Sequence, residues 1–86
     1  MTTLHLLDNS DNLEICLTAY QPDDTIVLIG KAVLMYNDSK LMNLNYRCLV
    51  ADLAARGLTE QVAANHKITS DQVADLCVSC SRQIAW

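Results

Sequence analysis

Aromatic residues are scarce in this chain of 86 residues, which has three tyrosines, one tryptophan and no phenylalanine. Because 51% of the residues are nevertheless hydrophobic, we expect a folded chain rather than a disordered one. Its core must then be aliphatic, built from Leu, Ile, Val, Ala and Met. At this length we expect one domain, residues 1–86, with a small core that association with other chains would help to stabilise.

Long apolar runs and an excess of positive charge are also missing. No stretch approaches the roughly 18 consecutive apolar residues of a membrane span, and the first residues lack the basic and apolar regions of a secretory signal. Four cysteines in such a chain predict free thiols in a reducing cytoplasm. Six basic residues against ten acidic ones give a net charge of -4, which argues against direct contact with nucleic acid.

Short apolar runs predict the strands. Residues 3–7, 25–30 and 45–50 each have a strand pattern, and the second is a continuous β-branched and aliphatic run that ends in Gly30, which is typical of a strand covered on both faces. Residues 66–69 predict a weaker fourth strand, and residues 31–40 fit either a short helix or a further strand. Since helical patterns lie between these runs, we expect an α/β fold with a mostly parallel sheet.

Three segments have helical signals. Apolar side chains fall on one helix face in two of them: Leu13, Cys16, Leu17 and Tyr20 in the first, and Val73, Leu76, Cys77 and Cys80 in the last. The spacing of Asp11 and Glu14 predicts a capping box for the first helix, and Ser70 is the expected N-cap of the last. A short helix over residues 51–57 should end at Gly57, the residue that most easily adopts a left-handed cap.

Cys77 and Cys80 have the CxxC spacing of a redox dithiol or of half a zinc site. A redox pair would lie at a helix N-terminus, where the dipole lowers the thiol pKa, whereas this pair lies toward a C-terminal end. Structural zinc usually needs four ligands, and there is no second CxxC, while His5 and His66 are isolated. We therefore favour core packing and expect no metal and no cofactor, with a metal or redox module as the alternative.

No familiar enzyme motif is present. The chain has no GxGxxG, HExxH or GxSxG, and its GKAV stretch lacks the upstream glycine of a phosphate loop. Asp23 and Asp24 predict a turn rather than an acid/base pair. Cys48 and Cys16 fall at apolar positions, so the core is the default for both, although a functional thiol at Cys16 stays open because reactivity depends on exposure and local charge.

Three stretches in register resemble a known family. DLAARGL (52–58) follows a predicted buried strand, QIAW (83–86) ends the chain, and TLHLL (3–7) forms its first apolar run. Their order and spacing, along nearly the whole chain, resemble the TusB/DsrH family of sulfur-relay subunits. The resemblance implies a small three-layer sandwich of the DsrE/F-like type, with a mostly parallel sheet flanked by helices.

The resemblance also implies partners and a pathway. We expect a cytoplasmic sulfurtransferase complex with TusC/DsrF-like and TusD/DsrE-like homologues, arranged as a dimer of heterotrimers. Such a complex relays persulfide sulfur, through a downstream sulfur-carrier protein, toward 2-thiolation of the wobble uridine of tRNA. In sulfur oxidisers a similar complex serves the dissimilatory sulfite reductase pathway. The catalytic cysteine usually belongs to the TusD/DsrE-type partner, which implies a non-catalytic role for this chain.

The resemblance singles out a few residues. In sulfur-oxidiser members a cysteine occupies the position that matches Cys16, which makes Cys16 the candidate catalytic residue, as a persulfide carrier. Arg56 and Trp86 are candidate interface anchors, because Arg and Trp are enriched at interface hot spots. The alternative is that Trp86 closes the core and Arg56 is solvated. The fourth-strand segment is shorter and more polar than the family pattern.

Overall fold

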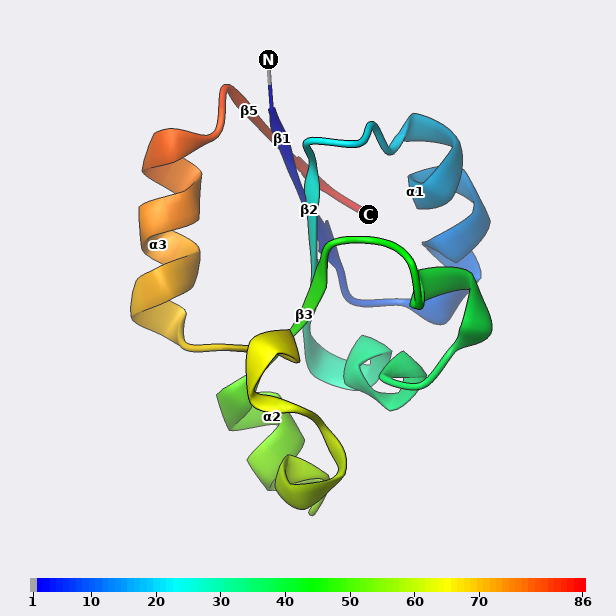
Figure 1. Ribbon diagram of the computed structural model, residues 1–86, viewed down its shortest axis with the longest axis vertical. Coiled ribbons are helices and arrows are strands. Elements are labelled where there is room, and N and C mark those ends of the chain that lie inside the picture. Colours follow the sequence, from blue (N-terminus) through cyan, green and yellow to red (C-terminus); the bar gives the residue numbers. More distant parts are fainter. Residues whose placement is uncertain (1) are drawn as a thin grey trace.

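Five parallel strands form a single sheet in the computed structural model, which describes residues 2–86. The strand order is β4-β3-β2-β1-β5. The strands are β1 (Thr3–Leu7), β2 (Thr25–Leu28), β3 (Tyr46–Leu49), β4 (Lys67–Ile68) and β5 (Arg82–Ala85). Helices lie on both sides of this sheet (Figure 1). The predicted α/β sandwich with a mostly parallel sheet is therefore confirmed.

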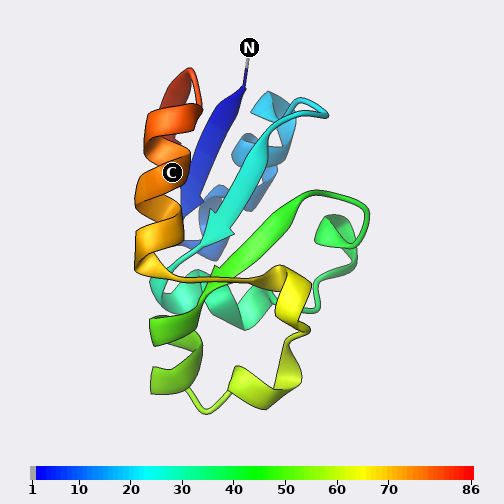
Figure 2. The same cartoon turned by 60° about the vertical axis from the view of Figure 1, so that its left-hand side comes forward.

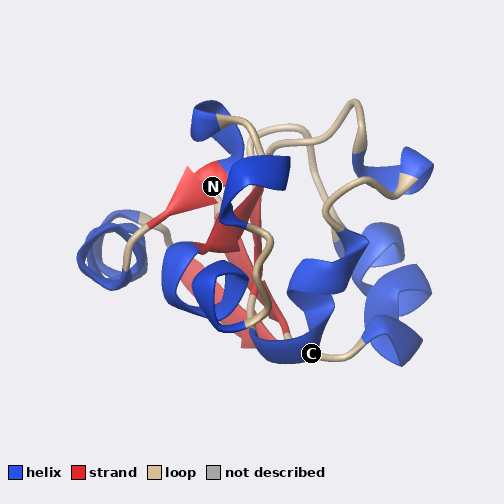
Figure 3. Cartoon of the chain, turned by 90° about the horizontal axis from the view of Figure 1, so that it is seen from below, coloured by secondary structure: helices blue, strands red, loops and turns tan. Residues whose placement is uncertain are grey.

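The helices divide unevenly between the two sides. The α-helices are α1 (Leu13–Ala19), α2 (Val50–Ala55) and α3 (Ser70–Ser79), and the 3-10 helices are η1 (Ser10–Asn12), η2 (Gly30–Met35), η3 (Ser39–Leu41), η4 (Thr59–Gln61) and η5 (Ala64–His66). Figure 3 shows the sheet from below, between α3 on one side and the α1 region on the other. None of the helices within residues 2–86 is long and apolar enough to cross a membrane.

Side chains alternate between the two faces of the sheet, and each face has its own core. On the α1 face, residues such as Leu7, Ile26 and Leu28 belong to the larger cluster of buried side chains. On the α3 face, the fully buried cluster consists of Leu4, Val27 and Ile68. β2 lies in the middle of the sheet, and its side chains point alternately into the two cores. It is therefore buried along its whole length.

The first helix follows its predicted stripe but not its predicted cap. Leu13 and Cys16 are buried, and Leu17 and Tyr20 pack against the same cluster, as the periodicity predicts. The prediction of a capping box formed by Asp11 and Glu14 is wrong. Asn9 instead accepts a hydrogen bond from the backbone N–H of Asp11 and opens η1, and α1 continues directly from that turn without a side-chain cap.

The last helix starts one residue earlier than predicted. Thr69, which follows β4 with an extended backbone, is the N-cap in place of Ser70. Its hydroxyl accepts from the Gln72 backbone N–H at 3.2 Å, and the Gln72 side chain accepts from the Thr69 N–H at 2.9 Å. This reciprocal capping box satisfies two backbone donors at the helix start.

Two short edge strands complete the sheet. β4 has only two residues, in keeping with the weak pattern over residues 66–69. β5 was not expected from the sequence; it pairs with β1, with His5 opposite Ile84. The chain therefore ends beside its own first strand, and its last residue reaches the α1 face.

Candidate functional site

A buried chain of hydrogen bonds joins Asp24, His5 and Trp86. His5 is 0% exposed and Asp24 is 1% exposed. The His5 Nε2 atom lies 2.9 Å from Oδ2 of Asp24, and the Trp86 Nε1 atom lies 3.0 Å from Nδ1 of His5. The two rings are nearly parallel, with 12° between their planes. This Asp24–His5–Trp86 network thus links the start of β2, the centre of β1 and the end of the chain.

The donors fix the directions of the hydrogen bonds in the network. An indole N–H can only donate, so His5 Nδ1 accepts and the imidazole proton lies on Nε2, directed at Asp24. Asp24 also accepts from the backbone N–H groups of Thr3 and Gln21, each at 2.9 Å. Burial alone would raise the pKa of Asp24, but the hydrogen bonds from His5, Gln21 and Thr3 outweigh it and lower the pKa below its ordinary value. The arrangement is an imidazole that donates to a buried carboxylate, which also accepts from two backbone N–H groups.

Sequence reasoning missed this network. It treated Asp24 as part of a turn and His5 as isolated, whereas the turn delivers Asp24 to the buried end of β1. The signal was present in two of the quoted motifs, since TLHLL contains His5 and QIAW ends in Trp86. Only the pairing of β5 with β1 brings these motifs together, and such long-range pairing is not encoded in the local sequence pattern.

Cys16, the candidate persulfide carrier, lies inside the α1-face core. Its side chain is 0% exposed, and burial, together with the negative charge of Asp24, raises its pKa to about 11. At pH 7 only about one thiol in 10⁴ would then be ionised, and the thiolate is the nucleophile. In this environment Cys16 is a weak nucleophile, and its role as a sulfur carrier stays a prediction.

The other three cysteines differ in exposure. Cys48 is 0% exposed, and burial raises its pKa to about 11 as well. Cys77 and Cys80 are only partly buried, so the expectation of a buried pair is wrong in degree, although both do pack against the α3-face cluster. They lie at the C-terminal end of α3, with Cys80 as its C-cap. Within residues 2–86 no group of three or more His, Cys, Asp or Glu side chains could hold a metal ion.

The DLAARGL motif forms most of helix α2, which follows β3, and the cap that ends this helix. Asp52 accepts a hydrogen bond from the Gly30 backbone N–H at 2.7 Å, which ties the ends of β2 and β3 together. The side chain of Leu53 is fully buried. Gly57 has φ +68, and the bonds from Leu58 N–H to Leu53 C=O and from Gly57 N–H to Ala54 C=O form a Schellman cap.

The two candidate anchors lie in different environments. Arg56 is exposed at the C-cap of α2 and forms no ion pair with any residue of the described chain, 2–86. Trp86 is partly buried against the α1-face core, and its N–H is already bonded to His5. An interface role for either residue stays a prediction, and for Trp86 it would use only the exposed part of the ring.

Fold and motifs together define a small α/β domain with a parallel sheet, whose motif residues serve to hold the sheet together. The family model described as "DsrH like protein" matches residues 8–83. The chain therefore belongs to the DsrH-like family of sulfur-relay subunits, which work in complexes with DsrE- and DsrF-like partners, and the resemblance to TusB/DsrH proteins is confirmed. A comparison with curated proteins found no match.

Proposed function

We propose that this chain is a non-catalytic structural subunit of a cytoplasmic sulfurtransferase complex that passes persulfide sulfur toward 2-thiolation of the tRNA wobble uridine. Its partners would be one TusC/DsrF-like and one TusD/DsrE-like homologue in a dimer of heterotrimers. The TusD/DsrE-like subunit would supply the sulfur-carrying cysteine and hand the sulfur to a downstream carrier protein. The net charge of -4 fits a subunit that leaves RNA contact to other components.

The placement of the thiols carries this proposal. A persulfide carrier needs an accessible thiolate near positive charge. Cys16 and Cys48 are fully buried with pKa values of about 11. Cys77 and Cys80 lie at a helix C-terminus, the negative end of the helix dipole, rather than near positive charge. None of the four cysteines therefore has the environment of a sulfur carrier in the chain as folded.

The residues that carry the family resemblance support the same conclusion. His5 and Trp86 bond to each other, Asp52 bonds to Gly30, and Gly57 caps α2. Each of these residues makes a contact that maintains the fold. A chain whose motifs preserve shape is suited to offer surfaces to partners.

A second candidate is the sulfur-oxidation pathway, with Cys16 as a sulfur-binding thiol. The observation in its favour is the cysteine itself, on α1 at the position where sulfur-oxidiser members have one. Because the side chain is 0% exposed, this role requires α1 to move away from the sheet when a partner or a persulfide donor binds.

Reconstitution tests both candidates. Co-expression with the two homologues, followed by size-exclusion chromatography and native mass spectrometry, should give one particle with equal numbers of each subunit. Sulfur transfer by this particle should be unchanged in Cys16→Ser and lost when the cysteine of the TusD/DsrE-like partner is replaced. A Cys16→Ser complex that assembles but no longer transfers sulfur would overturn the non-catalytic role. A chain that stays monomeric beside both homologues would overturn the subunit role itself.

A further inference from the structure

One helix covers only part of the α3 face. The partly buried stripe of α3, from Val73 to Cys80, packs against Leu4, Val27 and Ile68. In Figure 2, α3 runs along one side of this face, and no helix crosses in front of β3. Parallel sheets are normally covered on both faces, so this side of the sheet lacks part of a layer.

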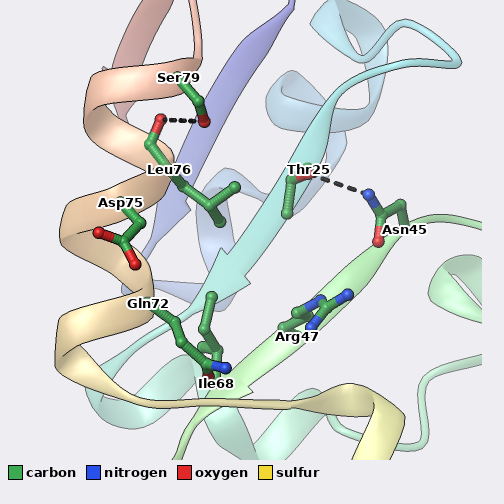
Figure 4. Close-up of a pocket in the computed structure, with 8 residues that line it drawn as sticks. All are labelled: Thr25, Asn45, Arg47, Ile68, Gln72, Asp75, Leu76 and Ser79. Atoms are coloured by element: carbon green, nitrogen blue, oxygen red, sulfur yellow. Dashed lines mark hydrogen bonds between the residues drawn. The ribbon is translucent and has the colours of Figure 1, made fainter.

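A groove of about 420 Å³ lies in this open region, between α3 and strands β2 and β3. One wall is a second stripe of α3, Gln72, Asp75, Leu76 and Ser79, and the other includes Arg47 of β3 (Figure 4). Ile68 and Leu76 supply the apolar part of the lining. The other lining residues are polar or charged, so the groove combines apolar contacts with polar and charged ones, as protein interfaces do.

The two charged residues of the groove have no internal partners. Arg47, on the strand side, and Asp75, on the helix side, form no ion pair with any residue in 2–86. By contrast, the carboxylate of Asp24 accepts three hydrogen bonds from within the chain. An occupant of the groove would therefore meet a cation on one wall and an anion on the other.

We propose that this groove seats an amphipathic helix of one of the two homologous partner subunits, placed beside α3 so that it completes the helical layer over β3 and β4. The helix would offer an apolar stripe to Ile68 and Leu76, a carboxylate to Arg47 and a basic side chain to Asp75. The inference rests on the proposed function, because it takes the partner from the sulfurtransferase complex.

The dimensions of the groove favour a helix. Its α3 wall runs from Gln72 to Ser79, which at 1.5 Å per residue is about 10 Å, or two turns of a facing helix. Helices pack side by side at about 8–10 Å, so a neighbour of α3 would lie over β3. A small molecule is a poorer fit, since ligand pockets bury most of their ligand, whereas Gln72, Asp75 and Ser79 are exposed along this wall.

Two neighbouring residues of α3 give a matched test. Ser79 lines the groove, while Val78 is 88% exposed and is not part of the lining. Ser79→Trp should fill the groove and exclude the partner helix. Assembly of the three-subunit complex should then weaken about tenfold or more, as it does when central interface contacts are lost. Val78→Trp, on the same helix, should assemble like the wild type. Circular dichroism and urea unfolding of each isolated variant establish that both still fold.

Carboxyl labelling gives an independent readout on the unaltered chain. A water-soluble carbodiimide with an amine should label Asp71 and Asp75 equally in the isolated chain, since both are exposed on α3. In the complex, Asp75 should be protected several-fold and Asp71, which lies outside the groove, should not. Arg47→Glu should weaken assembly, and a basic residue introduced on the partner helix should restore it.

The outcomes separate this inference from the proposed function. If the complex forms, Asp75 stays as reactive as Asp71 and Ser79→Trp assembles normally, the partner binds elsewhere and only the groove assignment is overturned. If the wild-type chain forms no complex with its homologues, both proposals fail together. If Ser79→Trp instead dissociates a homodimer of the isolated chain, the occupant is a second copy and the assignment to a partner subunit is overturned.

Discussion

The two faces of the sheet differ in how completely this chain covers them. On the α1 face, twelve residues form one buried cluster, closed by α1, the 3-10 helices and Trp86. On the α3 face, three residues are fully buried, and α3 itself has no fully buried residue. The first face is a finished core, whereas the second needs a further layer. The α1 face thus supplies most of the chain's own core, and the α3 face is the one to which we assign the partner helix.

Three charged groups illustrate the same division. Asp24, on the α1 side, is buried and bonded to His5 and to two backbone N–H groups. Arg47 and Asp75, on the α3 side, are without ion pairs within residues 2–86. Buried charges in proteins are paired or hydrogen-bonded because an unpaired one is costly. The unpaired charges are therefore tolerated only where water, or a partner, can reach them.

Truncation of one side chain from each face should reveal the largest difference. Leu28 is 0% exposed on the α1 face, so Leu28→Ala should destabilise the chain by about 3 kcal/mol through lost burial and the cavity left behind. Val73 is only partly buried on the α3 face, so Val73→Ala should reduce stability by about 1 kcal/mol. Urea unfolding of both variants measures the difference. Equal losses would show that the two faces contribute alike and would break the comparison.

Replacement of Asp24 should have the next largest effect. Asp24→Asn keeps the shape but puts an amide donor where at least one of the three hydrogen bonds needs an acceptor, and it removes the charge. Because the group is 1% exposed, we expect a loss of about 2 kcal/mol at pH 7. Asp23→Asn, at the exposed neighbouring position, is the matched control and should change stability by less than about 0.5 kcal/mol.

The same residue predicts how stability depends on pH. The folded-state pKa of Asp24 is lowered, so at acid pH the unfolded chain binds more protons at this group than the folded chain does. Its contribution is complete above the unfolded pKa of about 3.9 and is lost as the pH falls through the folded value. Urea unfolding between pH 7 and pH 2 should show this loss in the wild type and in Asp23→Asn. An equally steep loss in Asp24→Asn would assign it to other carboxylates.

Removal of one hydrogen bond from the network should have a smaller effect. Trp86→Phe keeps an aromatic ring against His5 but leaves Nδ1 of His5 without its donor. We expect a loss of about 1–1.5 kcal/mol, at the low end of the cost of about 1–3 kcal/mol for a buried group that loses its partner, because Trp86 is only partly buried. Hydrogen exchange should be faster at the backbone N–H of position 86, which donates to the Leu6 carbonyl, while the β2–β3 amides stay protected. Uniformly faster exchange over the whole sheet would contradict a local role for Trp86.

Much of the fold was predictable because the informative signals are local. The aliphatic run of β2, the apolar stripe of α1 and the glycine that ends α2 each depend on residues close together in the chain. The misplaced caps of α1 and α3 also reflect local competition, since Asn9 and Thr69 satisfy the backbone before the expected residues can. The element pattern survives such shifts of one or two residues.

The site was harder to predict because it depends on long-range contacts. His5 and Asp24 are 19 positions apart, and Trp86 is 81 positions from His5. No spacing rule joins them, and β5 has mostly exposed residues with little strand pattern. The exposure of Cys77 and Cys80 was misjudged for a related reason. The helical stripe predicts which way they face, but not whether a second helix of the same chain lies beside them.

The CxxC pair gives the smallest expected effect and the finest test of the comparison. Both cysteines pack from α3 onto the partly covered face, so Cys77→Ala combined with Cys80→Ala should destabilise the isolated chain by less than about 1 kcal/mol. Cys48→Ala, at a fully buried position on the α1 face, should have a larger effect although it changes one residue. Sulfur transfer by the assembled complex should be unaffected in the double variant, since packing alone explains both side chains. A stable, fully assembled double variant that no longer transfers sulfur would give the pair a chemical role and would move function to the α3 face.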